Sequence, residues 1–494
     1  MSTGAVYAAA VLTSMGGCVF PAPDAWEDTG PEDLPCDEHW PVVIVGGGPA
    51  GLAVAGEVGG ALLLEASGVL GGRYGLSSQF LVGTEEQYAL GFEDSPEVAE
   101  ADWPVLTGGE ATADTIRFFA GTRLVYDRWR SMGFQFGVMA LGNPFLREHP
   151  RTHFLVGDVG PGQALIDAVR TDVEIRLSTP AESIRVEGSR VVAVETAEAT
   201  LCTPIAVVAT GGYAANLEIL ALAAENPDGA WGGSVDTVPP RGQAILWARA
   251  GGWGIAGLED VGWFRRSLGI PDEYGRPVEP DVSSVVPWFW TDQDGTRFVD
   301  ESMTASVLLS TPYRAHAPVW GFGPRDALLA SLRTDGDRRA FNAAVEAGER
   351  IVCRPDAPTV AEAVGVDPEG LATTLDEIAY VVIHGAEDSV GRFGGTFPPL
   401  SDGGWCAFLP GQVASKTYGG VTVDAHGQAL DTLGAPIEGL YVVGEAAGMA
   451  APGLGGRSGF DGSVSAALWS GWRTGAWIAA QLAEQEDSIT SHAR

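Results

Sequence analysis

The feature that most constrains the fold of this chain is a glycine motif between an apolar run and a segment suited to a helix. Residues 42–45 are apolar and β-branched, which is typical of a buried parallel strand, and residues 49–57 are compatible with a helix. Between them lie Gly46, Gly48 and Gly51 in the spacing GxGxxG. The first glycine permits a tight turn, the second lets a pyrophosphate approach the backbone, and the third allows close packing of the helix. The motif predicts a dinucleotide whose phosphates lie at a helix N-terminus.

An acidic residue at a suitable distance supports this prediction. A second apolar run, residues 61–64, ends in Glu65, 19 residues after Gly46. A carboxylate at this point can bind a ribose 2′-OH, and an acid rather than a base favours an unphosphorylated adenosine ribose. The alternative is a glycine turn in an unrelated strand–helix unit, and the agreement of motif, flanks and acid makes it the weaker interpretation.

Further pieces of a nucleotide-binding fold occur near both ends of the chain. Residues 173–185 and 190–195 have the pattern of short strands, and residues 205–208 form a buried strand that ends in Ala-Thr-Gly-Gly. Residues 439–445 form another buried strand, followed by a helix from 463 to 481. We therefore expect an α/β fold with a Rossmann-like domain and a parallel sheet, interrupted by an α+β cap domain.

Charge and composition exclude other classes of protein. Lys and Arg total 29 against 64 Asp and Glu, and the formal net charge of −35 would repel a nucleic acid or an anionic membrane. With 45% hydrophobic residues in 494, the chain is a globular protein of enzyme size rather than a disordered one. The five cysteines include no CxxC pair and no cluster with histidine at ligand spacing. We therefore expect no metal site and no framework of disulfides.

A series of segments, in order, resembles the flavoprotein-subunit superfamily of fumarate reductase and succinate dehydrogenase, which also holds ketosteroid dehydrogenases. The segments are VVIVGGGPAGLAVA, LLLEASGVLGGR, VVATGGY, GQAILWARAGG, TDQDGTRFVDE, KTYGGVTVD, IEGLYVVGEAAG and GGRSGFDGSVSAALWSGWRTG. The resemblance implies FAD and a cap domain that closes over the flavin. It also implies the following division of the chain: a signal- or tether-like leader at 1–39, FAD-binding parts at 40–245 and 406–482, a cap or substrate domain at 246–405, and a tail at 483–494.

The resemblance also implies the residues that bind FAD. Glu445 would hold the ribityl hydroxyls, and Ser463 would start a helix beneath the pyrimidine ring, where the helix N-terminus stabilises negative charge on reduced flavin. In the respiratory members a histidine after the second strand links the flavin covalently, and residues 68–80 here contain none, so we expect non-covalent attachment. The other expected FAD-binding residues are Gly46, Gly48, Pro49, Ala50, Gly51, Glu65, Ala66, Gly72, Arg73, Ile184, Ala209, Thr210, Gly211, Gly212, Gly444 and Val464.

The catalytic pattern departs from the dicarboxylate enzymes of this superfamily. Ala305 and Ser306 stand where a proton-delivering arginine and its acidic neighbour are expected, and Arg265 and Lys416 stand where histidines are expected. Loss of a placed proton donor costs roughly 10²- to 10⁴-fold in rate, so we do not expect a standard fumarate or succinate enzyme. A ketosteroid 1-dehydrogenase is disfavoured as well, because AAPGLGGRSG replaces its tyrosine-rich segment near the C-terminus.

Three residues could replace the missing catalytic groups, namely Lys416, Tyr418 and Arg457. Lys416 is the only lysine of the chain. Desolvated beside a flavin and an arginine, a lysine gives up its proton readily and can act as acid or base, which an arginine cannot. The alternative is a surface lysine on a turn. Arg457 would anchor a carboxylate or oxyanion, or instead brace a glycine-rich loop.

Two further features have a structural and a functional interpretation. Trp288, Phe289 and Trp290 would alternate between the two faces of a strand, and core packing of the cap is favoured over an aromatic substrate wall. His153 would line the nucleotide-domain side of the cleft or pack beside it.

The expected function is that of an FAD-dependent oxidoreductase, a dehydrogenase or reductase acting on a small organic substrate. Hydride would pass between flavin N5 and the substrate at a CH–CH bond. The alternatives are a flavoprotein oxidase, a CH–OH dehydrogenase, or a catalytically degenerate flavin-binding lipoprotein of the cell envelope. The partners are then a small-molecule substrate and an electron donor or acceptor that the sequence does not name, with no nucleic acid.

The N-terminal segment leaves the localisation open. Residues 5–17 form an uncharged apolar run before Cys18, which resembles a bacterial lipoprotein signal, although no basic residue precedes it and Met15 replaces the usual Leu. Residues 19–39 are acidic and proline-rich, as in a flexible tether. The chain is either exported and lipid-anchored at Cys18 in a bacterial envelope, or cytoplasmic with a frayed leader.

Overall fold

The computed structural model describes residues 35–72, 78–107, 111–138, 149–222, 230–231, 240–282, 285–303, 310–400, 404–448 and 463–492. Contacts between residues divide the chain into two compact units, Met1–Pro35 and Cys36–Arg494. The helices and strands described below belong to the second unit. Six residues discussed above lie outside the described part: Met15, Cys18, Arg73, Ala305, Ser306 and Arg457.

A large sheet forms the centre of the predicted FAD-binding domain. Its strand order is β1-β10-β9-β22-β11-β2-β3-β7, with β8 added beside β9 and β21 beside β22. The five strands from β22 to β7 are parallel to their neighbours, which confirms the predicted Rossmann-like α/β fold. The bounds are β1 Glu38–His39, β2 Val43–Val45, β3 Leu62–Leu64, β7 Glu174–Arg176, β8 Ala181–Glu187, β9 Arg190–Thr196, β10 Thr200–Cys202, β11 Ala206–Val208, β21 Gln428–Leu430 and β22 Pro436–Val442.

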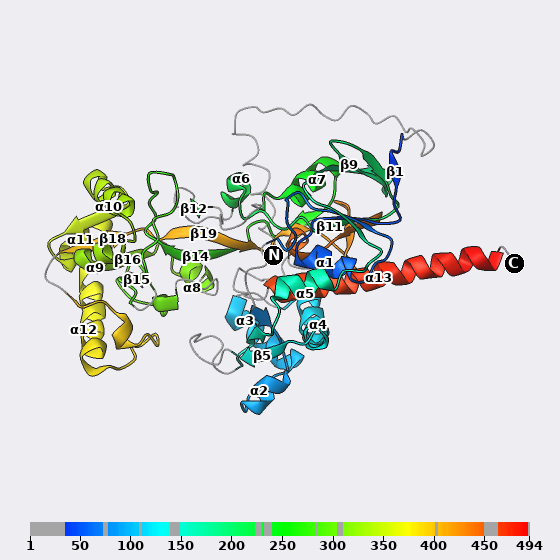
Figure 1. The fold of residues 1–494 in the computed structure, drawn as a ribbon. Coiled ribbons are helices and arrows are strands. Elements are labelled where there is room, and N and C mark those ends of the chain that lie inside the picture. Colours follow the sequence, from blue (N-terminus) through cyan, green and yellow to red (C-terminus); the bar gives the residue numbers. More distant parts are fainter. Residues whose placement is uncertain are drawn as a thin grey trace, which may run out of the picture. The chain divides into compact units, whose positions relative to one another are not determined.

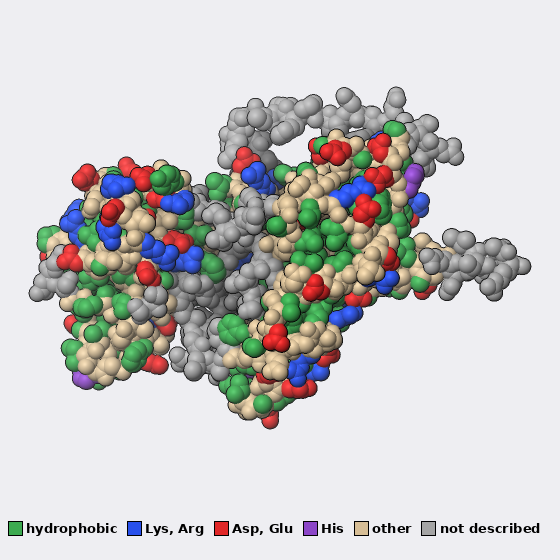
Figure 2. Space-filling model, viewed as in Figure 1, with side chains coloured by type: hydrophobic (Ala, Val, Ile, Leu, Met, Phe, Trp, Pro, Cys, Tyr) green, Lys and Arg blue, Asp and Glu red, His purple; other side chains and the backbone are tan. Residues whose placement is uncertain are grey.

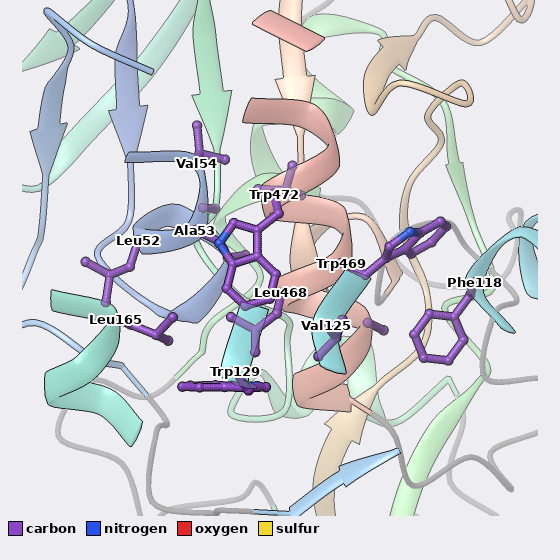
Figure 3. Packing of buried hydrophobic residues seen from close by; sticks show 14 of the residues in the cluster. Leu52, Ala53, Val54, Phe118, Val125, Trp129, Leu165, Leu468, Trp469 and Trp472 are labelled. Atoms are coloured by element: carbon purple, nitrogen blue, oxygen red, sulfur yellow. The ribbon is translucent and has the colours of Figure 1, made fainter. Parts of the chain in front are cut away.

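Both faces of this sheet are covered, because successive side chains of a strand point to opposite faces. Ile44 packs on one face with α1, α4, α5 and α13, in a core rich in tryptophan and leucine (Figure 3). Val43 and Val45 pack on the other face with α7. The helices are α1 Pro49–Ala55, α4 Ala113–Ser131, α5 Pro161–Asp167, α7 Gln243–Gly251 and α13 Ser463–His492.

Helix α13 is longer than the sequence pattern indicated. It starts at Ser463 as expected, but it continues to His492 through most of the segment expected to be a tail. Residues 482–492 contain neither glycine nor proline, so nothing in this segment ends the helix. Trp469 and Trp472, on its first half, pack against Phe118 and Trp129 of α4 (Figure 3).

A second, three-stranded sheet of order β4-β6-β5 packs on the same core. His153 on β6 is fully buried there, with Nε2 2.7 Å from Thr84 Oγ1 and Nδ1 2.9 Å from the Arg151 carbonyl oxygen. Of its two interpretations, the structure therefore supports packing. The bounds in this region are β4 Ser78–Phe80, α2 Glu85–Ala89, α3 Pro96–Thr107, β5 Gln135–Val138 and β6 Thr152–Val156.

The cap is built on a four-stranded antiparallel sheet of order β15-β16-β18-β17 (Figure 1). Strands β14 and β19, with β12 beside β19, form a ribbon that connects this region to the FAD-binding domain along the chain. The bounds are β14 Val261–Ser267, β15 Phe289–Thr291, β16 Trp320–Pro324, β17 Ile351–Arg354, β18 Trp405–Phe408, β19 Gly411–Thr417 and β12 Ala230–Trp231, with helices α8 Ser310–Ala315, α9 Arg325–Ser331, α10 Asp335–Ala347, α11 Ala357–Val364 and α12 Pro368–His384. Shorter elements are α6 Leu217–Leu220, the paired strands β13 Ile255–Ala256 and β20 Gly420–Val421, and the 3₁₀ turns Glu301–Met303, Gly394–Thr396 and Gly444–Ala446.

The aromatic run of the cap is core packing, as the sequence favoured. Trp288 and Trp290 lie in one buried cluster and Phe289 in another, on opposite sides of the cap sheet. The expected domain boundaries fall inside two elements. Helix α7 packs in the FAD-binding domain beyond residue 245, and β18 pairs within the cap sheet beyond residue 405. The expected division into domains stays a prediction.

A buried ionic network holds the cap segment that the resemblance singled out. Arg297 donates two hydrogen bonds to Glu301, of 3.1 and 2.8 Å, and also pairs with Asp388. Arg392 donates to Glu301 at 2.9 Å and to the carbonyl oxygens of three other residues, at 2.7–2.9 Å (Val286, Trp288 and Thr396). The arginine and glutamate of the RFVDE segment therefore serve to hold the cap together.

The expectation of no disulfide framework is wrong. Cys36 is bonded to Cys202, and Cys353 to Cys406. The partners are 166 and 53 residues apart, and strand pairing brings each pair together, of β1 with β10 and of β17 with β18. His39 lies close enough to Cys36 and Cys202 to complete a set of metal ligands, but the two sulfurs are bonded to each other and are not thiolates.

The predicted leader is also too long. Residues 36–39 belong to the sheet, since β1 pairs with β10 and Cys36 is bonded to Cys202. Glu38 fixes this edge through two hydrogen bonds from Arg176, of 2.8 and 2.7 Å. The tether interpretation failed here because an acidic, proline-rich composition does not reveal a two-residue edge strand.

The described surface is mixed in charge. Figure 2 shows acidic side chains scattered over one face among arginines, without a large basic patch on that face. None of the described helices is both long and apolar enough to cross a lipid bilayer.

Candidate functional site

Four neighbouring strands of the central sheet bring the predicted motifs to one edge. Strands β3, β2, β11 and β22 are parallel, and the residues that follow them include Glu65, Gly46, Ala209 and Gly444, respectively. In open α/β sheets a ligand binds outside the carboxyl ends of the strands. Motifs almost 400 residues apart in sequence, at Gly46 and Gly444, therefore border one site.

The glycine motif leaves room for a phosphate. Gly46 has φ of +112°, and a side chain there would collide with the Ala209 carbonyl oxygen. A side chain at Gly51 would collide with the Gly46 carbonyl oxygen, so this glycine serves the turn itself. At Gly48, by contrast, no atom of the described residues lies within 4 Å of an added Cβ, and none of their side chains caps α1. An open space at an uncapped helix N-terminus fits a pyrophosphate.

Glu65 is held in a fixed position beside this space. Its Oε2 accepts a 2.8 Å hydrogen bond from Gly47 N, and its Oε1 accepts a 2.7 Å bond from Ser67 N. The carboxylate is buried. Each carboxylate oxygen can accept a second hydrogen bond, so Glu65 keeps the capacity to bind ribose hydroxyls.

The second acid, Glu445, joins three segments of the chain. Its Oε1 accepts hydrogen bonds from Thr417 N at 2.6 Å and from Thr417 Oγ1 at 3.0 Å. Thr417 Oγ1 also accepts a 3.3 Å bond from Tyr213 N. A side chain at Gly212 would collide with Thr417 Oγ1 and lie 2.7 Å from Glu445, so the glycine of the Ala-Thr-Gly-Gly turn permits this junction.

Two further observations fit a bound cofactor. Thr210 Oγ1 is buried and has no hydrogen-bond partner among the described residues. Gly72 lies next to the open phosphate space, since its added Cβ would be 3.2 Å from Gly48 Cα. Both residues were predicted from the sequence to contact FAD.

The remaining predicted cofactor residues are distributed around this edge. Pro49, Ala50 and Gly51 form the first turn of α1, Ala66 follows Glu65, and Gly211 lies between Thr210 and Gly212. Ser463 and Val464 start α13, whose Ser470 Oγ accepts a 2.9 Å bond from Gly444 N. The side chain of Ile184, on β8, packs in the core cluster with Trp247, so it can contact a cofactor only through its backbone.

Lys416 lies on a strand and is buried, which excludes the interpretation as a surface lysine on a turn. It is 8% exposed and pairs with Gly262 of β14. In the pairing of β14 with β19, Gly262 lies opposite Lys416 and Trp263 lies opposite Ala414, so the register skips Ser415. Such a β-bulge changes the direction of neighbouring side chains. Lys416 directly precedes Thr417, which binds Glu445.

Tyr418 lies in a different environment. Its side chain is fully buried in the hydrophobic core that contains α1 and α13, and its backbone N donates a 2.9 Å bond to the Asp260 carbonyl oxygen. The structure thus brings Lys416, Thr417 and Tyr418, as one strand end, to the edge of the central sheet where FAD is expected, called the FAD edge below. Arg457, the third catalytic candidate, is outside the described residues.

Thr417 is a site residue that sequence reasoning did not select, and Arg265, which stands where the resemblance expects a histidine, is a second buried polar residue of the β14–β19 ribbon. Arg265 is buried on β14, three residues beyond Gly262, and its guanidinium lies 4.0 Å from the centre of the Tyr313 ring. A signal for Arg265 existed, because a charged residue occupies an inward position of a strand whose alternate residues are buried. For Thr417 the sequence gives no signal beyond its place in KTYGG.

Comparison of the sequence with models of protein families identifies the family of this chain. The chain matches the FAD binding domain family over residues 41–459. It is a member of that family. The predicted FAD cofactor is thereby confirmed, and the open glycine cradle and the two positioned acids are where the chain would hold it.

The relatives agree with the superfamily expected from the sequence. The chain is 25% identical over 459 residues to an NADH:fumarate oxidoreductase of Klebsiella pneumoniae (strain 342), covering 86% of this chain and 46% of that protein. It thus spans about half the length of this curated relative.

Two solved structures share the fold. One is the 3-ketosteroid-Δ4-(5α)-dehydrogenase from Rhodococcus jostii RHA1, with TM-score 0.66, 19% identity and coverage of 90% of this chain and 98% of that one. The other is the 3-ketosteroid Δ1-dehydrogenase from Sterolibacterium denitrificans, with TM-score 0.62, 16% identity and coverage of 90% and 100%.

Proposed function

We propose that this chain is an FAD-dependent oxidoreductase that acts on a CH–CH bond of a small organic substrate. The observation that carries the proposal is the position of Lys416. This buried, titratable side chain lies one residue from Thr417, which is bonded to Glu445 at the FAD edge. Bound FAD supplies hydride chemistry at N5 of its ring. The chain must then supply or remove the proton on the second carbon, and we assign that task to Lys416.

The path of β19 supports this role. The strand follows β18 of the cap, pairs with β14, and ends at Thr417 on the FAD edge. Lys416 therefore lies on the element that passes from the cap to the cofactor. A rigid strand fixes a proton-transferring group better than a loop does.

We propose a substrate other than fumarate or succinate. The curated relative is by name a fumarate oxidoreductase. Here, however, Ala305 stands at the position expected for the proton-delivering arginine. In this proposal a residue of β19, Lys416, replaces the missing arginine as proton donor. The reaction direction and the electron donor or acceptor are left open by this argument.

The test compares Lys416→Met and Lys416→Arg with the wild-type protein. Both variants should retain FAD, measured by visible absorbance, and lose turnover by roughly 10²- to 10⁴-fold. Turnover is measured with a reduced viologen dye as electron donor and a panel of α,β-unsaturated acids and ketones as acceptors. Arginine keeps the positive charge but cannot give up its proton, so an active Lys416→Arg variant would exclude proton transfer by Lys416.

The chain offers an independent form of this test. Because Lys416 is the only lysine, acetylation modifies this side chain and the N-terminal amine alone and removes the positive charge of both. Loss of turnover in the acetylated wild type, with the low turnover of Lys416→Met unchanged by the same treatment, would agree with the mutagenesis.

The same measurements distinguish the alternative functions. Consumption of oxygen during turnover would indicate a flavoprotein oxidase, and bleaching of the flavin by alcohols alone would indicate a CH–OH dehydrogenase. Flavin that no donor reduces, and that passes no electrons from reduced viologen to any acceptor, would indicate a protein that only binds FAD.

A further inference from the structure

A histidine stands beside the Cys36–Cys202 disulfide, at the edge of the large sheet. Both cysteines are partly exposed, His39 is exposed, and one ligand atom from each of the three residues lies within 4.8 Å of the other two. Around a tetrahedral zinc ion, two thiolate sulfurs and an imidazole nitrogen lie about 3.6–3.8 Å apart, given the usual bond lengths to the metal. The three side chains are therefore close to the arrangement of a metal site, except that the two sulfurs are bonded to each other.

The backbone holds these residues together without the disulfide. Asp37 N donates a 3.0 Å hydrogen bond to the Thr200 carbonyl oxygen, and Trp40 N donates a 2.9 Å bond to the Cys202 carbonyl oxygen. In the parallel pairing of β1 with β10, His39 lies opposite Cys202. Reduction of the disulfide therefore separates the two sulfurs but leaves the strands that carry them paired.

The two acids that precede His39 are engaged in other contacts. Asp37 Oδ2 accepts a 2.8 Å bond from Thr200 N, and both carboxylate oxygens of Glu38 accept bonds from Arg176, of 2.8 and 2.7 Å. These contacts fix the edge strand further and leave the two cysteines and the histidine as the ligands. Because His39 is exposed, a metal ion can enter from solvent, and water can fill the fourth position.

We propose that Cys36, His39 and Cys202 form a redox-controlled zinc site, which binds Zn²⁺ when the disulfide is reduced and releases it when the disulfide forms. Thiolate and imidazole ligands suit zinc, whereas calcium and magnesium prefer oxygen ligands. The proposal requires neither FAD nor a substrate, so it stands separately from the function proposed above.

The exchange between the two states balances in electrons and protons. A dithiol gives two electrons and two protons to the Cys36–Cys202 bond and becomes a disulfide itself, which leaves two protein thiols. Zn²⁺ then displaces both thiol protons, because the ligands of the metal are thiolates. In the reverse direction the two thiolates give two electrons to an oxidised disulfide reagent, which becomes two thiols, and the zinc ion leaves.

The second disulfide provides a matched control. Cys353 and Cys406 also lie opposite each other on paired strands. Among the described residues, however, no histidine or carboxylate completes a set of three ligands with them. Reduction of this pair should therefore create no zinc site of comparable affinity.

The experiment measures metal binding by the full chain, with Co²⁺ as a spectroscopic substitute for Zn²⁺. In Cys18→Ala/Cys353→Ser/Cys406→Ser, Cys36 and Cys202 are the only cysteines left. After reduction with a phosphine and removal of the reagent, one Co²⁺ per chain should give the visible bands of a tetrahedral thiolate site, at longer wavelength than flavin absorption. Added Zn²⁺ should abolish these bands, and the unreduced protein should show none.

Two variants identify the ligands. His39→Ala keeps both thiols and should weaken zinc binding by more than the roughly 10- to 100-fold that loss of an outer-shell partner costs. Cys36→Ser/Cys202→Ser, which keeps the other cysteine pair, should give no tetrahedral cobalt bands after reduction. His384→Ala removes an exposed histidine of α12 and should leave cobalt binding unchanged.

Absence of tetrahedral cobalt bands in the reduced protein would overturn the proposal, and so would equal bands in His39→Ala. If the triple variant does not fold, reduced wild-type protein takes its place, and bands that persist in Cys36→Ser/Cys202→Ser would assign the metal to another site. Zinc that stays bound after reoxidation with oxidised glutathione would refute control by the disulfide.

Discussion

The backbone N and the Oγ1 of Thr417 both donate hydrogen bonds to Oε1 of Glu445, at 2.6 and 3.0 Å. This pair connects the end of β19 to the turn that follows β22. The carboxylate that the resemblance assigns to the ribityl hydroxyls is thus oriented by the strand that carries Lys416. Cofactor binding and the placement of the proposed proton-transferring group depend on the same contact.

The contact predicts the effect of substitutions at Thr417. Thr417→Val removes the hydroxyl bond to Glu445 and the acceptor for Tyr213 N, which should cost about 1 kcal/mol, or roughly fivefold in the FAD dissociation constant. Thr417→Ser keeps both bonds and should bind FAD as the wild type does. Fluorescence titration of the deflavinated protein measures both values, and equal affinity of the two variants would show that the hydroxyl does not position Glu445.

The cap network predicts a large loss of stability. Removal of one partner from a buried ion pair leaves the other charge uncompensated, which costs about 3–5 kcal/mol. Glu301→Ala leaves Arg392 in that state, whereas Arg297 keeps its pair with Asp388. We expect a marked fall in the urea midpoint of the variant, whereas Glu349→Ala, on the surface between α10 and β17, should have little effect. A Glu301→Ala variant as stable as Glu349→Ala would contradict the buried network.

Burial of His153 predicts a pH dependence of stability. Burial lowers the pKa of His153 below its ordinary value of 6.5, so the unfolded chain binds the proton more tightly than the folded chain. The stability that the neutral ring contributes is therefore complete above pH 6.5, and it is lost as the pH falls through the lower pKa of the folded state. His153→Gln should flatten the stability profile between pH 7 and 5 in urea titrations, and a profile as steep as that of the wild type would assign the dependence to other groups.

The sequence predicted the elements of the FAD edge well, for an identifiable reason. The strands that end at Gly46, Glu65, Ala209 and Gly444 are buried on both faces, so they appear as continuous apolar runs, and each turn carries a residue type that the turn requires. Such local signals do not depend on distant parts of the chain.

Features that depend on pairing between distant segments were missed. Cys36 meets Cys202 only because β1 adds to β10, and the two-residue strand that does this has no periodicity to detect. Thr417 carries no signal in the sequence, and its importance comes from Glu445, which lies 28 residues away.

The attachment of FAD remains a prediction of the sequence. Residues 68–80 contain no histidine for a covalent bond, and we expect the flavin to be released when the holoenzyme is precipitated with acid. A yellow supernatant over a colourless pellet is the expected result. Flavin fluorescence that stays with the denatured chain on an electrophoresis gel would contradict it.

We propose that the chain matures in an oxidising compartment and is anchored there by lipid on Cys18. Four of its five cysteines form two disulfides, and disulfides persist in exported proteins but rarely in the cytosol. The fifth, Cys18, is the residue that the sequence places after a signal-like run. Lipid on this cysteine with more than one acyl chain would hold the protein stably at a membrane.

The location of a Cys18→Ala variant in fractionated cells tests this proposal. Cys18→Ala should move the protein from the membrane fraction to the soluble fraction with its FAD content unchanged, and cytoplasmic protein that retains Met1 would refute export.

Deletion of residues 1–34 should leave FAD content and stability intact, whereas deletion of residues 1–39 also removes β1 and the Cys36–Cys202 bond. In the chain-entropy model a disulfide between residues 166 apart contributes about 5 kcal/mol, so the longer deletion, like Cys202→Ser, should lower the urea midpoint substantially. If both deletions are equally stable, β1 and its disulfide do not stabilise the sheet.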